Sequence, residues 1–519
     1  MAERESGSAG LWEEIKRRKV VRVVLAYVIV GWGLIQVADA TLEPLHLPEW
    51  AGTLVVWLVG LGFPIAVILA WTLDITPRGI EVTPAADEDV PPSPPTEASI
   101  AVLPFVNIGG SPDDEYFSDG LSEELINLLV RLQSLRVCSR TSSFALKGKD
   151  IDMPTIARQL GVRHVLEGSV RRSGDRVRIT AQLVDAAEDR HLWSKTFDRE
   201  LQDIFGVQDE IAASLFAELR LTLSADERQA IQSTTDSVAA LDCYLRGREL
   251  YHRPGHLEPA GEKFKEAIRI DPNYALAWAG LTYVCVDTYW YKDKDPVWIE
   301  RADEASRKAV ELAPHLAEPH AARGLLLRAA EKFDEADGEF DRAIAINPRL
   351  FEPIHFQAQM ARGLGQYKRA AELFERAAQV RPEDYQALAL AANMHEFLGD
   401  VNRARALAPE VLDRAKRALE LNPKDARALV LGSGVLYLLG RTEEALEWVE
   451  RAQVISPKSN GVMYNSACLY ARLGQTERAL DFVERAVALG SRNKRNFDSD
   501  KDLDSLRDHP RFKALMDSL

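Results

Sequence analysis

The sequence predicts three structural parts: an N-terminal two-helix transmembrane hairpin, a small α/β domain and a C-terminal α-solenoid. Two long apolar segments lie before residue 74, and strand and helix patterns alternate from residue 99 to residue 224. A motif of about 34 residues then recurs between residues 236 and 490. At 519 residues, with 28% charged and 46% hydrophobic residues, the chain is long enough for several domains.

Net charge and cysteine spacing exclude two classes of function. The formal net charge is −15, which argues against a nucleic-acid-binding protein, and we expect no nucleic-acid partner. The four cysteines include no CxxC pair, and even the two nearest, Cys243 and Cys285, are far apart in the sequence. A local zinc knuckle or redox dithiol is therefore excluded, and isolated buried thiols in a reducing compartment are expected.

The first apolar segments have the length of membrane spans. We predict helices at about 20–42 and 52–73, within a hairpin over 20–74, because residues 54–73 carry no charge in 20 positions. The loop between them is too short for anything but a turn. Glycines in both segments permit close helix contact, and so a homodimer through the hairpin.

Basic residues before the first span set the expected orientation. Segment 1–19 is basic and ends in four consecutive cations, whereas the loop between the spans has no Lys or Arg. The positive-inside rule then predicts a bacterial inner-membrane protein with two spans and most of the chain in the cytoplasm. Cleavage as a signal peptide at Ala38-Asp39-Ala40 is the alternative, but the leader is long and carries acids, and a second span follows.

Residues 75–98 form the expected linker. This stretch contains six prolines, and its acids outnumber its single arginine. Such a composition cannot support a core, so we predict an extended, partly polyproline spacer.

Residues 99–224 read as one small α/β domain. A strand from Ile100 leads to a helix through "GLSEELINLLVRL", and a second strand and helix follow in "LRVCSR" and "MPTIARQLG". Two alternating arms then meet at Ser173-Gly174-Asp175, which predicts a β-hairpin. A third strand and an amphipathic helix complete the domain.

The acidic stretch "GGSPDDEYFSDG" after the first strand resembles the mouth of an active site. It lacks GxGxxG spacing and a Walker lysine, and three adjacent acids would repel a phosphate. Adjacent acids also diverge in direction, and calcium-loop spacing is absent. We interpret the stretch as a turn followed by a helix entry rather than as a nucleotide or metal site.

A second loop, "SRTSSFALKGKD", concentrates donors and positive charge between a strand and a helix. An anion or an acidic partner could dock there. The alternative is a solvated connection whose hydroxyls cap the local backbone. The candidate residues are Arg140, Ser142, Ser143, Lys147 and Lys149.

Several stretches of this region resemble a known family. "SIAVLPFVN", "DEYFSDGLSEELIN", "GVRHVLEGSVRRSGDRVRITAQLVDA" and "HLWSKTFDRELQDIFGVQDEIA" are similar to the TolB amino-terminal-like (FlgO-like) domain of bacterial proteins. The resemblance implies an assembly or sensory α/β module without known chemistry of its own. Such domains often accompany helical repeats, sometimes in chains that also carry a cyclase, and the apolar hairpin resembles the membrane anchor of that group.

The C-terminal half repeats with a period of 34. Prolines close the successive motifs at 272, 314, 348, 382, 423 and 457, and Ser491 takes the corresponding place in a seventh unit. The pattern A-x3-F-x2-A-x4-P with this period is that of the tetratricopeptide repeat. The intervals that end at Pro314 and Pro423 are longer than the others and indicate insertions. We predict about seven repeats over 236–490 and a capping segment over 491–519.

The first helix of each repeat is expected to line the inner wall of the solenoid, which we predict binds a protein or peptide partner. By the family's pattern, positions 2, 5, 9 and 12 of a unit face this groove. The paired Lys/Asn clamp for a C-terminal carboxylate is not visible. The candidate partner-binding residues are Glu318, Arg328, Glu352, His355, Gln359, Arg362 and Arg427.

No catalytic motif accompanies these domains. HExxH, GxSxG, Walker A, kinase and cyclase signatures are absent, and Pro254 and Gly255 separate the one i,i+4 histidine pair. We therefore expect no enzyme, no cofactor and no metal, but a membrane-anchored interaction scaffold. The alternatives are a sensory or regulatory component related to cyclase-associated receptors, acting through a separate effector, and an enzyme hidden in the α/β domain.

Overall fold

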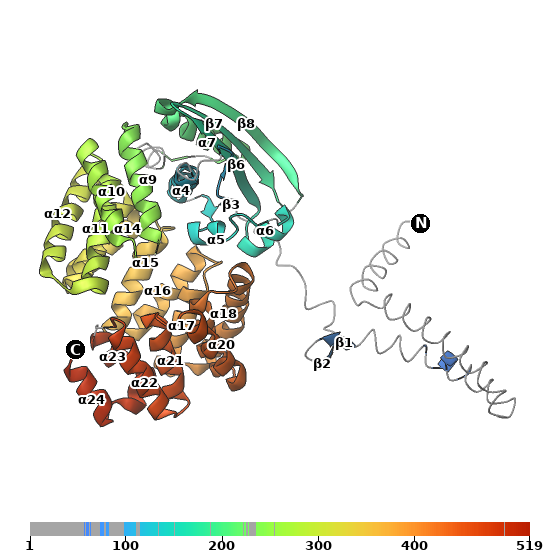
Figure 1. Ribbon diagram of the computed structural model, residues 1–519, viewed down its shortest axis with the longest axis vertical. Helices are drawn as coiled ribbons and strands as arrows, with labels where there is room; N and C mark the ends of the chain where they lie inside the picture. The colour runs from blue at the N-terminus through green and yellow to red at the C-terminus, as the bar shows by residue number, and fades with distance from the viewer. Residues whose placement is uncertain are drawn as a thin grey trace. The chain divides into compact units, whose positions relative to one another are not determined.

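The chain contains two compact units, Met1–Ser93 and Pro94–Leu519, and each is described by itself (Figure 1). The computed structural model describes residues 57, 59–61, 63, 73–76, 79–82, 98–109, 115–132, 134–149, 151–186, 188–221, 223–224, 227, 235–253, 255–491 and 494–519.

In the first unit, a short antiparallel hairpin is the described β structure. It joins β1 (Leu73–Thr76) to β2 (Gly79–Val82), with Leu73 opposite Val82. It lies where the second predicted span ends and the predicted linker begins.

The predicted two-span membrane localisation is corrected by the structure. Crossing a bilayer takes a helix of about 20 apolar residues. Over the part of the chain that the structure describes, no helix reaches the length and apolarity that a membrane span needs. Most of the predicted spans, 20–42 and 52–73, and of the linker 75–98 lies outside the described residues. The inner-membrane assignment, and with it the homodimer through the hairpin, is not supported.

A mixed sheet forms the centre of the α/β domain. Its strand order is β5-β3-β6-β7-β8, with β4 also paired to β6. Strands β3, β4 and β5 run parallel to their neighbours, whereas β6, β7 and β8 form an antiparallel meander. The predicted hairpin turn is confirmed, because Ser173 pairs with Arg176 and Gly174 has a φ of 59°. The strands are β3 (Ser99–Val102), β4 (Val106–Asn107), β5 (Arg136–Val137), β6 (His164–Ser173), β7 (Arg176–Asp185) and β8 (Arg190–Glu200).

The two faces of the sheet bury different helices. Alternation along β3 sends Ile100 and Val102 to the face covered by α4 (Glu115–Val130) and α7 (Ile204–Glu218). Ala101 points to the opposite face and packs with α6 (Met153–Leu160). The described helices of this domain also include the five-residue α5 (Arg140–Phe144).

Seven helix pairs follow within residues 235–491, in agreement with the predicted repeat (Figure 1). The pairs are α9 (Val238–His252) with α10 (Leu257–Ile270), α11 (Ala275–Thr288) with α12 (Pro296–Leu312), α13 (Ala317–Ala329) with α14 (Phe333–Ile346), α15 (Phe351–Gly363) with α16 (Tyr367–Val380), α17 (Tyr385–Phe397) with α18 (Val401–Leu421), α19 (Ala426–Leu438) with α20 (Thr442–Ile455), and α21 (Asn460–Arg472) with α22 (Thr476–Ala488).

Small residues on one helix and aromatic residues on the other let the two helices of a pair approach closely. A Cβ added at Gly324 of α13 would meet the ring of Phe340 at 2.6 Å, and Phe340 is fully buried in α14. The two irregular repeat intervals have structural counterparts. The first holds the π-helical turn η4 (Tyr289–Asp293), and the second holds the 21-residue helix α18.

The C-terminal segment, defined as residues 494–506, does more than cap the last repeat. It comprises α23 (Lys494–Ser499) and η5 (Lys501–Leu506), and α24 (Pro510–Asp517) follows it. Phe497 and Leu503 enter the core of the last repeats. The segment also reaches back along the solenoid, since Tyr367 of α16 donates a hydrogen bond to the Ser499 carbonyl over 2.6 Å.

The α/β domain and the repeats share one hydrophobic core. Helix α4 packs on α9 so closely that a Cβ at Gly120 would meet Leu245 at 2.8 Å. Further along, turns between repeats contact the domain: Asn347 donates to the Val130 carbonyl over 3.1 Å, and Glu383 accepts from the Ser139 amide over 2.9 Å. The two parts therefore form one folded unit rather than two independent domains joined by a linker.

Candidate partner-binding groove

The first helices of the repeats form an inner wall, which we define as α11, α13, α15, α17, α19 and α21. Within this set α11 packs on α13, α13 on α15, α17 on α19, and α19 on α21. Over the described residues, no second helix packs comparably on the next second helix. The first helices therefore lie closer together and present the concave side of the stack.

The structure places all seven predicted groove residues on first helices. Glu318 and Arg328 lie on α13, and Arg427 lies on α19. The other four, Glu352, His355, Gln359 and Arg362, lie on α15.

Partners within the protein already engage three of these residues. Glu318 pairs with Arg131 of the α/β domain at 3.0 Å, so it joins the two domains. Glu352 pairs with Arg381 at 3.1 Å. The Arg427 guanidinium donates to the side-chain oxygen of Gln386. These contacts hold neighbouring elements together and leave fewer side chains for a ligand.

His355 is held neutral among cations. Its ring stacks on Phe351, with centroids 5.0 Å apart, and its Nε2 accepts from the Gln359 amide over 2.9 Å. Burial, and then the positive charges of four arginines around it, lower the pKa of His355 to about 3. The arginines, in order of effect, are Arg427, Arg381, Arg328 and Arg362.

Arg328 and Arg362 differ from the other members of the set. Both side chains are half-buried, and among the described residues neither has a carboxylate partner. The Arg328 guanidinium lies over the Trp290 ring, 5.2 Å from its centroid. Burial and the charge of Arg362 lower the pKa of Arg328 to about 10, with Tyr291 acting in the opposite sense. Two cations thus share a region of the wall that lacks a neutralising acid.

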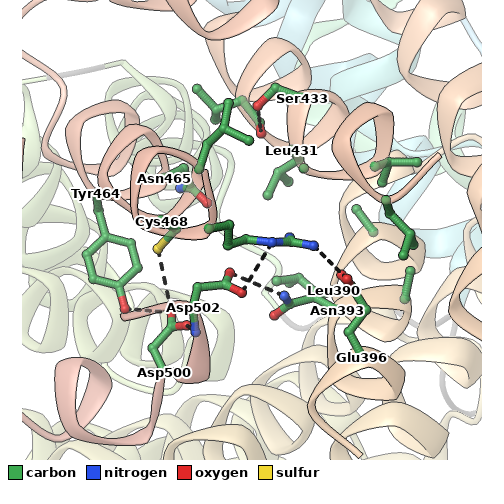
Figure 2. A pocket seen from close by; sticks show the side chains of 18 of the residues that line it. Leu390, Asn393, Glu396, Leu431, Ser433, Tyr464, Asn465, Cys468, Asp500 and Asp502 are labelled. Atoms are coloured by element: carbon green, nitrogen blue, oxygen red, sulfur yellow. Dashed lines mark hydrogen bonds and ion pairs between the residues drawn. The ribbon is translucent and has the colours of Figure 1, made fainter. Parts of the chain in front are cut away.

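Towards the C-terminal end of the wall, a small pocket is lined by the C-terminal segment and by first helices (Figure 2). It encloses about 70 Å³ between α17, α19, α21 and η5, and Arg362 is one of its lining residues. Arg472 pairs there with Glu396 at 2.6 Å and lies 3.8 Å from Asp502. Asn393 donates to the other Asp502 oxygen over 3.4 Å. The sequence did not indicate this pocket.

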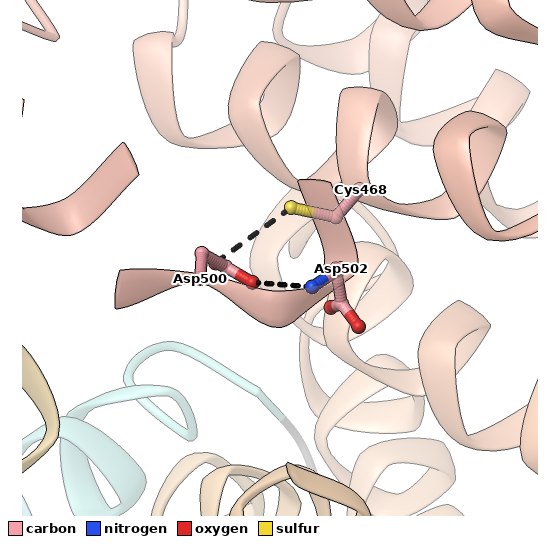
Figure 3. Close-up of side chains that lie close together, drawn as sticks. All are labelled: Cys468, Asp500 and Asp502. Carbon is pink, nitrogen blue, oxygen red and sulfur yellow. Dashed lines mark hydrogen bonds between the residues drawn. The ribbon is translucent and has the colours of Figure 1, made fainter. Parts of the chain in front are cut away.

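Cys468, Asp500 and Asp502 meet at the edge of this pocket, with ligand-type atoms within 4.8 Å of one another (Figure 3). Asp500 is already used: it accepts the Tyr464 hydroxyl over 2.7 Å and the Asp502 amide over 3.0 Å. Burial, and then the neighbouring Asp500 charge, raise the pKa of Asp502, while burial and the same charge raise the pKa of Cys468. Capping of η5 and the Arg472 ion pair account for the cluster without a metal ion.

The predicted anion loop becomes α5 and the turns that follow, with its cations paired inside the protein. Ser139 caps α5 by accepting from the Ser142 amide over 3.2 Å, and Ser143 is fully buried. Lys147 pairs with Asp119 at 2.6 Å. Lys149 donates to the carbonyl of Leu421 in the repeats.

Arg140 belongs to a buried charge cluster between the domains. Glu123 of α4, 3% exposed, is paired with Arg140 at 2.7 Å and with Arg248 of α9 at 2.5 Å. Burial alone would raise the pKa of Glu123, but Arg248, His252 and Arg140 outweigh it and hold the pKa well below its usual range. This cluster locks the α/β domain to the first repeat.

Comparisons with known families support the repeats, and they match the α/β domain to a family other than the expected one. Residues 410–460 and 461–489 each match a family described as tetratricopeptide repeat. Residues 96–214 match the family described as HilA/YgeH-like transcriptional regulator, second domain. The resemblance to the TolB amino-terminal-like domain is not among these matches.

One curated relative and several solved structures are similar to the chain. A Rhizobium meliloti (strain 1021) protein named "Putative adenylate cyclase 3" is 36% identical over 273 residues, which are 51% of this chain and 46% of the relative. The chain thus spans less than half of that protein's length.

Solved structures that are similar to the chain include a pilus factor and a complex with a capped nucleotide. PilW, a type IV pilus biogenesis factor, is 23% identical, with 42% of this chain and 94% of PilW covered and a TM-score of 0.33. Human IFIT1 bound to m7Gppp-AAAA is 14% identical, with 60% and 70% covered and a TM-score of 0.39. At these TM-scores neither likeness carries an argument about function.

Proposed function

We propose that this chain of tetratricopeptide repeats is an interaction scaffold that binds a protein or peptide partner along its inner wall. The observation that carries the proposal is the wall itself. Its first helices present half-buried polar side chains toward one surface, and two of these, Arg328 and Arg362, lack a carboxylate partner among the described residues. Repeats of this kind generally bind protein or peptide segments in such a groove.

The α/β domain is the second functional part of the proposal. Its core is continuous with the first repeats, and Glu123 ties it to α9 through buried ion pairs. A change in this domain would therefore reach the repeats through α4. This arrangement supports an assembly or sensory module, as the TolB amino-terminal-like resemblance implies, acting together with the repeats.

A second candidate function rests on the cyclase-named relative. The chain is similar to part of that protein, over 46% of its length, and the second candidate is a regulatory component that acts through a separate effector. We propose that the chain is not an enzyme. The purified chain incubated with ATP and Mg²⁺ or Mn²⁺ is expected to form no cyclic AMP. Formation of cyclic AMP would contradict this and favour catalysis.

Photo-crosslinking in cells tests the scaffold. The photoreactive amino acid p-benzoylphenylalanine replaces Tyr291, which is 67% exposed beside the inner wall. The matched control carries it at Val454, 82% exposed on the second helix α20. We expect a discrete crosslinked protein from position 291 that is absent from position 454. Identical patterns at the two positions would overturn the proposal.

A further inference from the structure

Arg328 and Arg362 occupy equivalent places in adjacent repeats. They are separated by one repeat period, and each lies in the last turn of its first helix. Residues one period apart stack along the wall of such a solenoid. The two guanidiniums therefore form one patch, which agrees with the direct effect of Arg362 on the pKa of Arg328.

The patch has aromatic surroundings that an insertion between repeats supplies. The π-helical turn η4 extends α11 and carries Trp290, over which Arg328 lies, and the exposed Tyr291. Turns of this type recur at functional sites, where they redirect side chains. The neutral His355 and the amide of Gln359 border the same region and add no negative charge.

The neighbouring part of the wall already holds one carboxylate of the C-terminal segment. Asp502 of the C-terminal segment lies against Arg472 at 3.8 Å and accepts from Asn393 over 3.4 Å. Arg362 lines the pocket that this segment closes. It therefore lies between the part of the wall that the C-terminal segment covers and the part that carries Arg328. The protein itself thus shows that carboxylates in a peptide fit this wall.

We propose that the patch formed by Arg328 and Arg362 binds side-chain carboxylates of an acidic peptide segment in a partner protein. The proposal rests on the scaffold function and gives its partner a chemistry. A planar guanidinium can take a carboxylate through two parallel hydrogen bonds. A guanidinium also binds phosphates, so a nucleic acid is the rival occupant that the oligothymidylate measurement below tests. The peptide is favoured because the neighbouring part of the wall already holds the Asp502 carboxylate.

Fluorescence anisotropy on the full chain tests the proposal with a defined probe. The probe is a fluorescein-labelled ten-residue peptide of alternating glutamate and alanine, and its control has glutamine at every glutamate. Arg328→Gln and Arg362→Gln are each expected to weaken binding of the glutamate peptide about tenfold or more, as loss of a charged hydrogen bond implies. Arg376→Gln, on the second helix α16 with an exposed side chain, is the matched control and should bind as the wild type does.

Three results would overturn the proposal: no binding of the glutamate peptide, equal binding of the glutamine peptide, or equal losses in Arg376→Gln and the patch variants. Tighter, patch-dependent binding of a labelled oligothymidylate would overturn it in favour of nucleic acid. Melting curves establish that each variant is folded. If the crosslink from position 291 persists while the glutamate peptide fails to bind, the scaffold stands and only the acidic partner is wrong.

Discussion

The two halves of the inner wall share one backbone plan and differ in how their charges are balanced. In the C-terminal half, Arg472 is neutralised by Glu396 and by Asp502 of the C-terminal segment. In the N-terminal half, Arg328 and Arg362 have no such partner among the described residues. One repeat period after Arg362 the same position is occupied by Glu396, which pairs with Arg472, and the C-terminal segment adds Asp502. We propose that the half with unpaired arginines is the part that binds a partner.

The largest expected effect is a loss of stability when the ion pairs in the C-terminal half of the inner wall are removed. Arg472→Gln removes the cation between two largely buried carboxylates, Glu396 and Asp502, whose side chains are 19% and 16% exposed. An uncompensated buried charge costs about 3 to 5 kcal/mol, so we expect the free energy of unfolding to fall by about that amount. Urea denaturation followed by circular dichroism measures it. A loss no greater than that of Arg376→Gln would show that the two halves are not balanced differently.

The next expected effect is a pH dependence of the free energy of unfolding that arises in the N-terminal half of the wall. Asp287 of α11 accepts the Tyr251 hydroxyl over 2.7 Å, and burial raises its pKa to about 6. Because this pKa lies above the unfolded value, the protonated carboxyl favours folding below about pH 4, and that stability is lost as the pH rises through 6. Asp287→Asn should therefore be more stable than the wild type by about 3 kcal/mol at pH 8.

That advantage should disappear near pH 4, where both side chains are neutral. Unfolding curves at the two pH values measure the difference. An advantage that is independent of pH would mean that the Asp287 carboxyl is not the titrating group.

The smallest expected effect is the change in stability when Arg328 or Arg362, in the N-terminal half of the wall, is replaced. Arg328→Gln and Arg362→Gln remove half-buried cations that have no ion pair to lose among the described residues and that repel each other. We expect their free energies of unfolding to stay within about 1 kcal/mol of the wild type, on the stabilising side. A loss comparable to that of Arg472→Gln would reveal a structural partner and remove the contrast between the halves.

Local patterns predicted the repeats well. The regularly spaced prolines mark the ends of successive second helices, and the two long intervals correspond to η4 and to the long helix α18. The turn at Gly174 is also local, because a two-residue hairpin needs a positive φ there.

Contacts between residues far apart in the sequence could not be predicted from local patterns. Asp500 and Asp502 fit a terminal cap, and nothing near them indicates that they meet Tyr464 and Asn393 on the inner wall. An anion site and a solvated connection were the two predictions for the loop around Arg140 and Lys147, and in the structure acids on α4 engage both side chains. Those acids lie 17 and 28 residues earlier in the chain, so only the packing of α5 on α4 reveals them.

The most direct test of the account is the crosslink from position 291, compared between the wild type and the Arg328→Gln/Arg362→Gln double variant in cells. The account predicts one crosslinked protein whose attached peptide is rich in Asp and Glu, with the crosslink lost in the double variant. An undiminished crosslink in the double variant, or a crosslinked peptide without acidic residues, would contradict it.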